Sequence, residues 1–298
     1  MTTPSRPVQG ILWMILTGLC FIAVTAIVKY AAQDLPAAES AFLRYLIGLA
    51  FLLPLARTLL ATRMPARDLA LFGARGMLHA VGVMLWFYAM TEIPIAEVTA
   101  MNYLNPVYVT LGAALFLGER LEKRRISAVL AALVGVLVIL RPGFREVETG
   151  HLAMLVTAIL FGGSYLLAKP LSDRHSAPVV VAMLSLSVTL GLAPFAFAVW
   201  VTPTLTQLAW MALVAFFATA GHYTMTLAFA AAPISVTQPV TFLQMVWAVL
   251  LGWAAFGEPP DAYVILGAAI IIGAVSFIAW REARAKRIVT PHHTATRH

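Results

Sequence analysis

The second half of this chain repeats the plan of its first half. In the first half, Pro94-Ile95-Ala96 is followed by Leu117-Gly118-Glu119. The second half places Pro233-Ile234-Ser235 and Phe256-Gly257-Glu258 at the same separation, so both motifs are shifted by 139 residues (94 to 233, and 118 to 257). Single residues fit this shift to within one position: Gly10 with Gly150, Lys29 with Lys169, and Gly135 with Gly273. Many secondary transporters are built from two such repeats, with the substrate site at the interface between them.

The composition places most of the chain in lipid. Hydrophobic residues make up 61% of the 298 residues and charged residues only 11%, whereas a soluble domain carries roughly 25% charged residues. The net charge of +7 does not indicate nucleic-acid binding, because the basic residues flank apolar stretches. The single cysteine, Cys20, excludes an internal disulfide and a cysteine-cluster metal site. We therefore expect membrane lipid around the chain, no nucleic-acid partner, no cofactor and no bound metal.

Apolar stretches long enough to span a membrane occur ten times, with short polar connections between them. They lie at residues 9–30, 38–58, 69–91, 94–117, 124–141, 149–170, 177–200, 206–230, 234–256 and 261–281. The predicted fold is an all-α integral membrane protein of ten transmembrane helices. It comprises two five-helix repeats, residues 1–145 and 146–288, followed by a disordered tail at 289–298.

The basic residues predict the orientation of these spans. If the spans alternate in direction, most arginines and lysines fall on one side, and only Lys29, Arg141 and Arg145 fall near the other. Both termini are therefore expected in the cytoplasm, with the chain in the inner membrane of a bacterium. Because each repeat has an odd number of spans, the second repeat is inverted relative to the first, which lets one sequence plan serve two access states.

Four short motifs resemble those of one transporter family. They are Phe42-Leu43-Arg44-Tyr45, Trp86-Phe87-Tyr88-Ala89, Asn105-Pro106-Val107-Tyr108 and Leu117-Gly118-Glu119-Arg120. Together with ten spans in two halves, these motifs resemble the EamA-like drug/metabolite transporter superfamily over nearly the whole chain. The second repeat departs from the pattern, because Met245 stands at the position of Pro106 and Pro259 at that of Arg120.

The resemblance implies a ten-helix inverted-repeat fold and transport of a small metabolite. Within the family, the nearest functional idea is the amino-acid exporters of the YddG type. The resemblance also implies a structural role for Glu119 and Glu258, which end the fourth and ninth spans in symmetric places.

Two histidines inside the membrane are the first candidate site residues. An ionisable group costs about 2.5–3.5 kcal/mol at the centre of a spanning helix, so each needs a reason. His79 lies near the middle of the third span, on one helical face with Arg75 and Trp86, and His222 lies near the middle of the eighth span. Neutral imidazole both donates and accepts hydrogen bonds and titrates near neutral pH. We expect His79, Trp86 and His222 to line the substrate site, with helix packing and proton coupling as alternative roles for the histidines.

Amide side chains beside prolines form a second group of candidates. Asn102, Tyr103 and Asn105 precede Pro106 in the fourth span, and proline opens a helix by removing a backbone donor. The ninth span carries Thr237, Gln238, Pro239, Thr241 and Gln244 at the corresponding level. Such paired, proline-interrupted helices predict a binding site. The alternative is hydrogen bonding between helices.

Aromatic and hydroxyl side chains complete the predicted pocket. Tyr103 and Tyr165 lie deep in their spans, and Thr17 lies in the first span. We expect the first, third, fourth, sixth, eighth and ninth spans to surround the pocket. The small residues of the fifth and tenth spans are expected to pack at the periphery or in a homodimer. The pocket should be apolar and aromatic, with little fixed charge.

Two charges toward the outer side predict a gate. Arg44 and Glu97 have no evident partner in the sequence, and a salt bridge between them would close the external end. The alternative is a structural role for both.

The predicted function is secondary transport of a small molecule by alternating access. The pocket suits neutral and aromatic amino acids, so their export is predicted first, with export of lipophilic cationic drugs or other metabolites, and solute import, as alternatives. No HExxH, GxSxG or P-loop motif is present. The chain is therefore predicted not to be an enzyme, and an intramembrane enzyme is the alternative from another class. Proton coupling, exchange and facilitated diffusion stay open at this point.

Overall fold

The computed structural model describes residues 6–55, 61–116, 123–144, 146–232, 237 and 240–288, and the secondary-structure elements within these ranges are helices. In the first half they are α1 (Pro7–Ala31), α2 (Ala37–Ala50), η1 (Leu53–Leu55), α4 (Ala66–Glu92), α5 (Ile95–Asn102), α6 (Asn105–Phe116) and α7 (Lys123–Leu140). In the second half they are α8 (Thr149–Ser172), α9 (Ala177–Ala198), α10 (Leu205–Ala231), α12 (Leu243–Phe256) and α13 (Ala262–Ile288).

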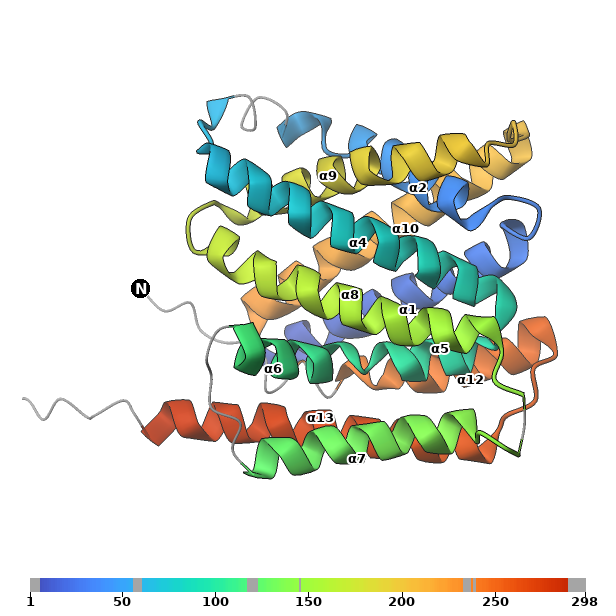
Figure 1. Cartoon of the computed structure of the whole chain (residues 1–298), viewed down its shortest axis with the longest axis vertical. Coiled ribbons are helices and arrows are strands. Elements are labelled where there is room, and N and C mark those ends of the chain that lie inside the picture. The colour runs from blue at the N-terminus through green and yellow to red at the C-terminus, as the bar shows by residue number, and fades with distance from the viewer. Residues whose placement is uncertain are drawn as a thin grey trace, which may run out of the picture.

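The helices run side by side and alternate in direction (Figure 1). We call the end of the bundle at which α1 begins and α13 ends the terminal end, and the opposite end the distal end. With α5 and α6 counted as one interrupted pass, the described helices make ten passes, which confirms the predicted fold class. The predicted spans match these passes closely, except that α2 ends at Ala50 and α13 continues to Ile288.

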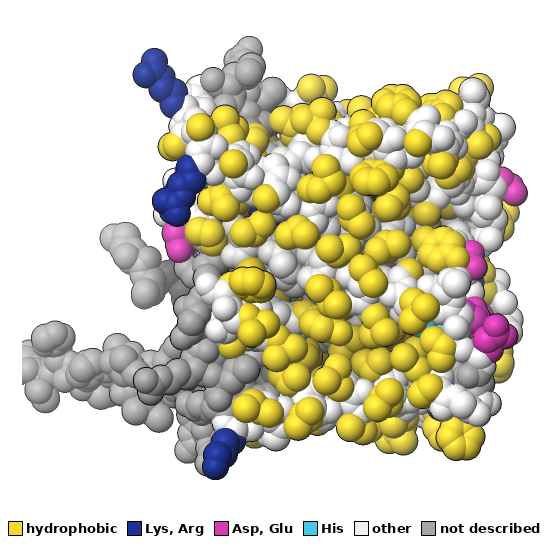
Figure 2. Space-filling model, viewed as in Figure 1, with side chains coloured by type: hydrophobic (Ala, Val, Ile, Leu, Met, Phe, Trp, Pro, Cys, Tyr) yellow, Lys and Arg dark blue, Asp and Glu magenta, His cyan; other side chains and the backbone are white. Residues whose placement is uncertain are grey.

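Length and hydropathy agree with a multi-pass membrane protein. Among the described residues, five helices are long and apolar enough to cross a membrane, and three shorter helices are apolar. Large apolar side chains such as Leu130, Leu190 and Trp253 are exposed on the outside of the bundle. On the face in Figure 2, hydrophobic side chains cover the region between the two ends, and charged side chains lie at the ends. Lipid can solvate this apolar surface, whereas its exposure to water would carry a large free-energy cost.

The packing of the helices repeats with the sequence. Gly82 of α4 lies against the ring of Phe161 on α8, and Gly221 of α10 lies against Phe21 on α1. These two contacts are related by shifts of 139 residues for the glycines (82 to 221) and 140 for the phenylalanines (21 to 161). The pair α1 and α10 is therefore the repeat image of the pair α8 and α4, so each half of the chain is packed against the other.

The fourth pass is broken at its middle, as the proline there predicts. A turn at Tyr103 and Leu104 separates α5 from α6, and Pro106 is the second residue of α6, where a helix does not use the missing N–H. The ninth pass has a turn at Phe242, the repeat counterpart of Tyr103 (103 to 242). The rings of these two residues lie 5.6 Å apart in an edge-to-face arrangement.

The Tyr103 hydroxyl also donates to the Thr241 carbonyl oxygen at 3.2 Å. The two broken passes therefore cross at their break points. Gln238 and Pro239, which were predicted to interrupt the ninth pass, lie outside the described residues.

Helices α7 and α13 pack on each other at the periphery, as expected from their small residues (Figure 1). Gly135 and Gly267 face each other at the contact, where a side chain on either would meet the backbone of the partner helix. The glycine pair thus sets the close approach of these helices.

Replacing Gly267 by alanine should destabilise this pair, whereas Gly273→Ala on the same helix should not. A Cβ atom at Gly267 would lie 2.5 Å from the Gly135 carbonyl oxygen, whereas nothing lies within 4 Å of one at Gly273. Overpacking costs about 1–3 kcal/mol, and alanine is favoured over glycine by up to about 1 kcal/mol in an open helix position. The melting temperature of the purified protein in detergent should fall for G267A and hold or rise for G273A. Equal melting temperatures for the two variants would contradict the close approach.

Candidate functional site

A cavity of about 290 Å³ lies in the middle of the bundle and extends toward the terminal end. We call it the central cavity. Its walls come from α2, α4, α8, α9 and α10, and its ionisable and aromatic lining residues are Arg44, Tyr45, Arg75, His79, Tyr165 and His222. Three of the predicted site residues, His79, Tyr165 and His222, therefore meet in one place, although they are far apart in the sequence.

His79 is held from two sides at the centre of α4. Its Nε2 atom is hydrogen-bonded to the Tyr45 hydroxyl at 3.1 Å, and its Nδ1 atom lies 3.4 Å from the Ser164 hydroxyl. The imidazole also stacks on the Phe161 ring, with centroids 4.6 Å apart. The ring is thereby fixed in one orientation with its hydrogen-bonding atoms engaged, which suits a wall that positions a ligand.

His222 occupies the facing wall on α10. Its ring meets Phe21 edge-to-face at 5.2 Å. Phe21 and Phe161 are repeat counterparts, so the two halves each pack a phenylalanine against one histidine. The cavity is thus bounded by aromatic rings on both sides.

A second, smaller cavity of about 50 Å³ collects most of the remaining predicted site residues. Its lining includes Trp86, Asn102, Tyr103 and Gln244, together with Thr25, Val98 and Thr99. The indole nitrogen of Trp86 is buried and has no hydrogen-bond partner in the part of the chain that the structure describes. Asn105 donates to the Asn102 side-chain oxygen at 2.9 Å and supports this wall from behind.

Two predicted site residues have packing roles instead. The Thr17 hydroxyl lies 2.9 Å from that of Thr224, which joins α1 to α10. Thr241 contributes its carbonyl oxygen to Tyr103 at the crossing of the broken passes. Neither residue lines the central or the smaller cavity.

The spans around the central cavity differ from those expected. The second and seventh passes, α2 and α9, supply walls of the central cavity, while the first, fourth and ninth passes line the smaller cavity. The expectation of little fixed charge is also wrong, because Arg44 and Arg75 line the central cavity.

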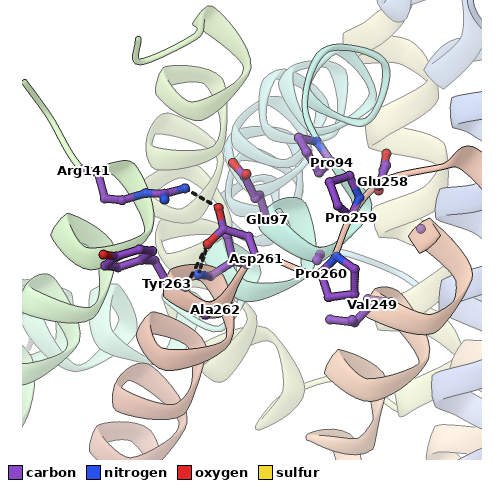
Figure 3. Close-up of a pocket in the computed structure, with 14 residues that line it drawn as sticks. Pro94, Glu97, Arg141, Val249, Glu258, Pro259, Pro260, Asp261, Ala262 and Tyr263 are labelled. Carbon is purple, nitrogen blue, oxygen red and sulfur yellow. Dashed lines mark hydrogen bonds and ion pairs between the residues drawn. The ribbon is translucent and has the colours of Figure 1, made fainter. Parts of the chain in front are cut away.

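A third cavity, of about 500 Å³, lies at the distal end between α5, α12 and the start of α13 (Figure 3). Its charged groups are bound to one another or to neighbouring side chains: Arg141 pairs with Asp261, Glu97 with His151, and Glu258 with Lys29. Because these charges already have partners, this larger cavity is a weaker candidate for recognising a ligand than the central one.

One cluster of polar contacts joins three helices at the distal end around Glu258. Lys29 Nζ lies 2.9 Å from one Glu258 carboxylate oxygen and also donates to the Ile93 carbonyl oxygen at 2.8 Å. The second carboxylate oxygen of Glu258 accepts the backbone N–H of Ile95 at 3.0 Å. We call Lys29, Ile93, Ile95 and Glu258 the distal seal, because it ties α1, the start of α5 and the end of α12 together.

The Gly-Glu ending of the ninth pass has a physical reason in this cluster. Gly257 ends α12 with a left-handed backbone (φ 66°), which glycine adopts without strain. The turn brings the Glu258 carboxylate back over Gly252, where a Cβ atom would collide with it. Both glycines are therefore needed to place Glu258 in the distal seal. Glu119, its predicted counterpart, lies outside the described residues.

The predicted gate residues are separated in this conformation. Glu97 accepts a hydrogen bond from His151 Nε2, because His151 Nδ1 itself accepts the Glu148 backbone N–H at 3.1 Å. Arg44 lies in the central cavity and places its guanidinium 3.9 Å from the centre of the Tyr45 ring. Glu97 is thus part of the distal end and Arg44 part of the central cavity.

Comparison with known proteins places this arrangement in a family. The sequence profile of the EamA-like transporter family matches residues 8–141 and again residues 148–280. The chain belongs to the EamA-like transporter family. A crystal structure with 21% sequence identity matches this fold with a TM-score of 0.57, over 94% of this chain and 100% of its own.

Curated relatives of this EamA-like transporter carry names of small-molecule carriers. A riboflavin transporter of Rhizobium johnstonii is 35% identical, with 95% of each chain covered. A riboflavin transporter of Vibrio cholerae is 29% identical over 96% of this chain and 98% of its own. A pseudopaline exporter of Pseudomonas aeruginosa is 27% identical over 89% of this chain and 93% of its own. These relatives are transporters of small molecules and not enzymes.

Two of the ionisable and aromatic residues that line the central cavity, Arg75 and Tyr45, were not predicted as site residues. Arg75 was placed on the His79 face, but it was counted among the basic residues that flank the spans. Tyr45 was noted only as part of a family motif. The signal for Arg75 was its position one turn before His79, which places both on one face of a helix that begins at Ala66.

In this EamA-like transporter, Lys29 and Glu258 of the distal seal should make coupled contributions to the free energy of unfolding. Lys29→Met and Glu258→Gln should each lower the free energy of unfolding, and the double variant should lose less than their sum, by at least about 1 kcal/mol. The physical reason is that the two side chains are only 14% and 15% exposed, so each is costly to leave alone. Denaturant unfolding in detergent micelles measures the cycle.

The control for this cycle is Glu92→Gln, an exposed carboxylate at the same end of the bundle. It should leave the unfolding free energy nearly unchanged. Strictly additive losses for Lys29 and Glu258 would show that the pair contributes nothing as a pair.

Proposed function

We propose that this EamA-like transporter is a secondary carrier for a small metabolite with a planar ring, and that riboflavin is the first substrate to test. The observation that carries the proposal is the central cavity, whose aromatic walls meet at mid-bundle. Tyr45, His79, Tyr165 and His222 offer ring faces for stacking, and the Tyr165 hydroxyl and the His222 imidazole add polar groups for the edge of a heterocycle. The riboflavin transporters among the relatives, which align over nearly their whole length, support the same choice.

The size of the cavity supports a small substrate. Ligand pockets for drug-sized molecules enclose about 300–1,000 Å³, and the central cavity holds about 290 Å³ in this conformation. A flavin would fill it and use the open side toward the terminal end for its flexible chain.

Export of aromatic amino acids is the second candidate function. The arginines of the central cavity favour it, because a guanidinium binds an α-carboxylate while the aromatic walls cover the side chain. The same arginines weigh against lipophilic cationic drugs, since none of the described residues that line the cavity is acidic.

We further propose that the two halves, residues 1–145 and 146–288, alternate between two arrangements. In the conformation described here the distal seal is formed and the central cavity lies toward the terminal end. We assign the terminal end to the cytoplasm and the chain to the inner membrane, because the basic residues concentrate at that end. Opening the distal seal while the terminal end closes would deliver the substrate to the other side.

Proteoliposomes that hold the purified protein and unlabelled riboflavin should accumulate labelled riboflavin from outside with saturation. His79→Ala and His222→Ala should each lower the initial rate by roughly tenfold, because each removes an aromatic ring from the wall of the cavity. Tyr223→Phe is the matched control, since Tyr223 neighbours His222 but is 65% exposed on the outside of α10. Saturable uptake of tryptophan or phenylalanine without any riboflavin uptake would reject the first candidate in favour of the second.

Breaking the distal seal should shift the exposure of the two ends in opposite directions. In a Cys20→Ser background, one cysteine is placed at Thr99 in the smaller cavity or at Ser185 in the central cavity. Adding Lys29→Met should speed the reaction of Thr99→Cys with a membrane-impermeant maleimide from the distal side, and slow that of Ser185→Cys from the terminal side. Faster labelling at both positions would indicate general loosening and would contradict the alternation.

A further inference from the structure

A buried cation lines the central cavity. Arg75 is 7% exposed, and its buried Nε and Nη1 atoms have no hydrogen-bond partner among the described residues. Arginine stays protonated in proteins, so it cannot escape burial by losing its charge. A buried charge is normally paired, because leaving it alone is strongly unfavourable. An anion in the central cavity would supply the partner that this charge lacks among the described residues.

A second arginine reinforces this field from the neighbouring helix. Arg44 of α2 lines the same cavity, half-buried, with its guanidinium against the Tyr45 ring. None of the described residues that line the cavity is an aspartate or glutamate. Two permanent positive charges facing one space surrounded by low-dielectric protein and lipid attract a negative group strongly.

The two arginines break the repeat symmetry of the scaffold. At shifts of 139 and 140 residues, Arg75 corresponds to Val214 or Ala215, and Arg44 to Met183 or Leu184, all of them apolar. The contacts that build the scaffold, such as Gly82 on Phe161 and Gly221 on Phe21, occur in both halves. The two arginines are therefore no part of the packing that repeats between the halves.

We propose that Arg44 and Arg75 form an anion-recognition site in the central cavity, so that the carrier prefers a ring-bearing molecule with a carboxylate or phosphate group to an uncharged one such as riboflavin. This inference deepens the proposed function and rests on the central cavity being the substrate site. The Arg75 guanidinium holds the anion by a charge-assisted hydrogen bond. The aromatic walls, Tyr45, His79 and Tyr165, then hold the ring of the same molecule.

The test compares charged and uncharged molecules of the same shape. One pair is riboflavin 5′-phosphate and riboflavin, measured by quenching of flavin fluorescence, and the other is indole-3-acetate and indole-3-acetamide, measured by thermal shift. The first pair reports on a phosphate and the second on a carboxylate. The wild-type protein should bind the charged member of at least one pair about tenfold to a hundredfold more tightly.

Arg75→Gln should remove most of this preference and change the affinity for the uncharged member by less than about threefold, because charge-assisted hydrogen bonds carry the difference. Arg75→Lys keeps the charge and should retain part of the preference. Arg67→Gln is the control, since Arg67 is exposed on the same helix and lies outside the cavity. If Arg75→Gln does not fold, Arg44→Gln provides the same comparison on the other wall.

The outcomes separate this inference from the proposed function. Tight binding of indole-3-acetate that Arg75→Gln abolishes, without binding of either flavin, would reject the flavin carrier and keep the anion site. Riboflavin binding and transport with no preference for its phosphate, unchanged in Arg75→Gln, would keep the flavin carrier and overturn the anion site. Absence of binding of all four probes by folded wild-type protein would also overturn the anion site.

Discussion

This bundle depends on the contact of a glycine with a phenylalanine ring. The contact occurs twice, once with the glycine in the first half and once with the glycine in the second half, and each time the ring comes from the other half. In lipid there is no hydrophobic force between helices, so close packing at small residues decides which helices associate. Gly82 with Phe161 joins α4 to α8, and Gly221 with Phe21 joins α10 to α1. The same two rings contact His79 and His222. The contacts that hold the halves together therefore also shape the walls of the central cavity.

The distal seal shows how the repeat could serve alternation. Lys29, Ile95 and Glu258 come from both halves, and their counterparts by the repeat shift are Lys169, Ile234 and Glu119, which carry the same residue types. Inversion of the second repeat assigns these counterparts to the opposite end of the fold. The Ile234 and Glu119 positions and the Lys169 side chain lie outside the described part of the chain. Under the proposed alternation we expect one set of residues to be paired while the other is apart.

Much of the fold could be predicted from the sequence, because lipid imposes a length and a polarity on each span. The break near Pro106 and the repeat relation of the two halves followed from local chemistry and from the sequence shift. The placement of single side chains was harder, since periodicity shows which residues share a helix face but not which neighbour that face meets. Thr17 is an example, because its hydroxyl is used by Thr224 on α10.

Arg75 illustrates the other limit of prediction from the sequence. Near the end of a span it looked like a basic residue that sets orientation, but α4 begins at Ala66 and carries it about 13 Å into the bundle. There its charge has a different consequence from that of the charges at the distal end. Lys29 and Glu258 neutralise each other and join helices, whereas Arg75 lines the central cavity with two buried donors that have no partner among the described residues. Paired charges between helices stabilise one conformation, and an unpaired charge in a cavity attracts a ligand of opposite charge. Under the proposed function, the pair at the distal end would serve closing and the arginine in the middle of the bundle would serve recognition.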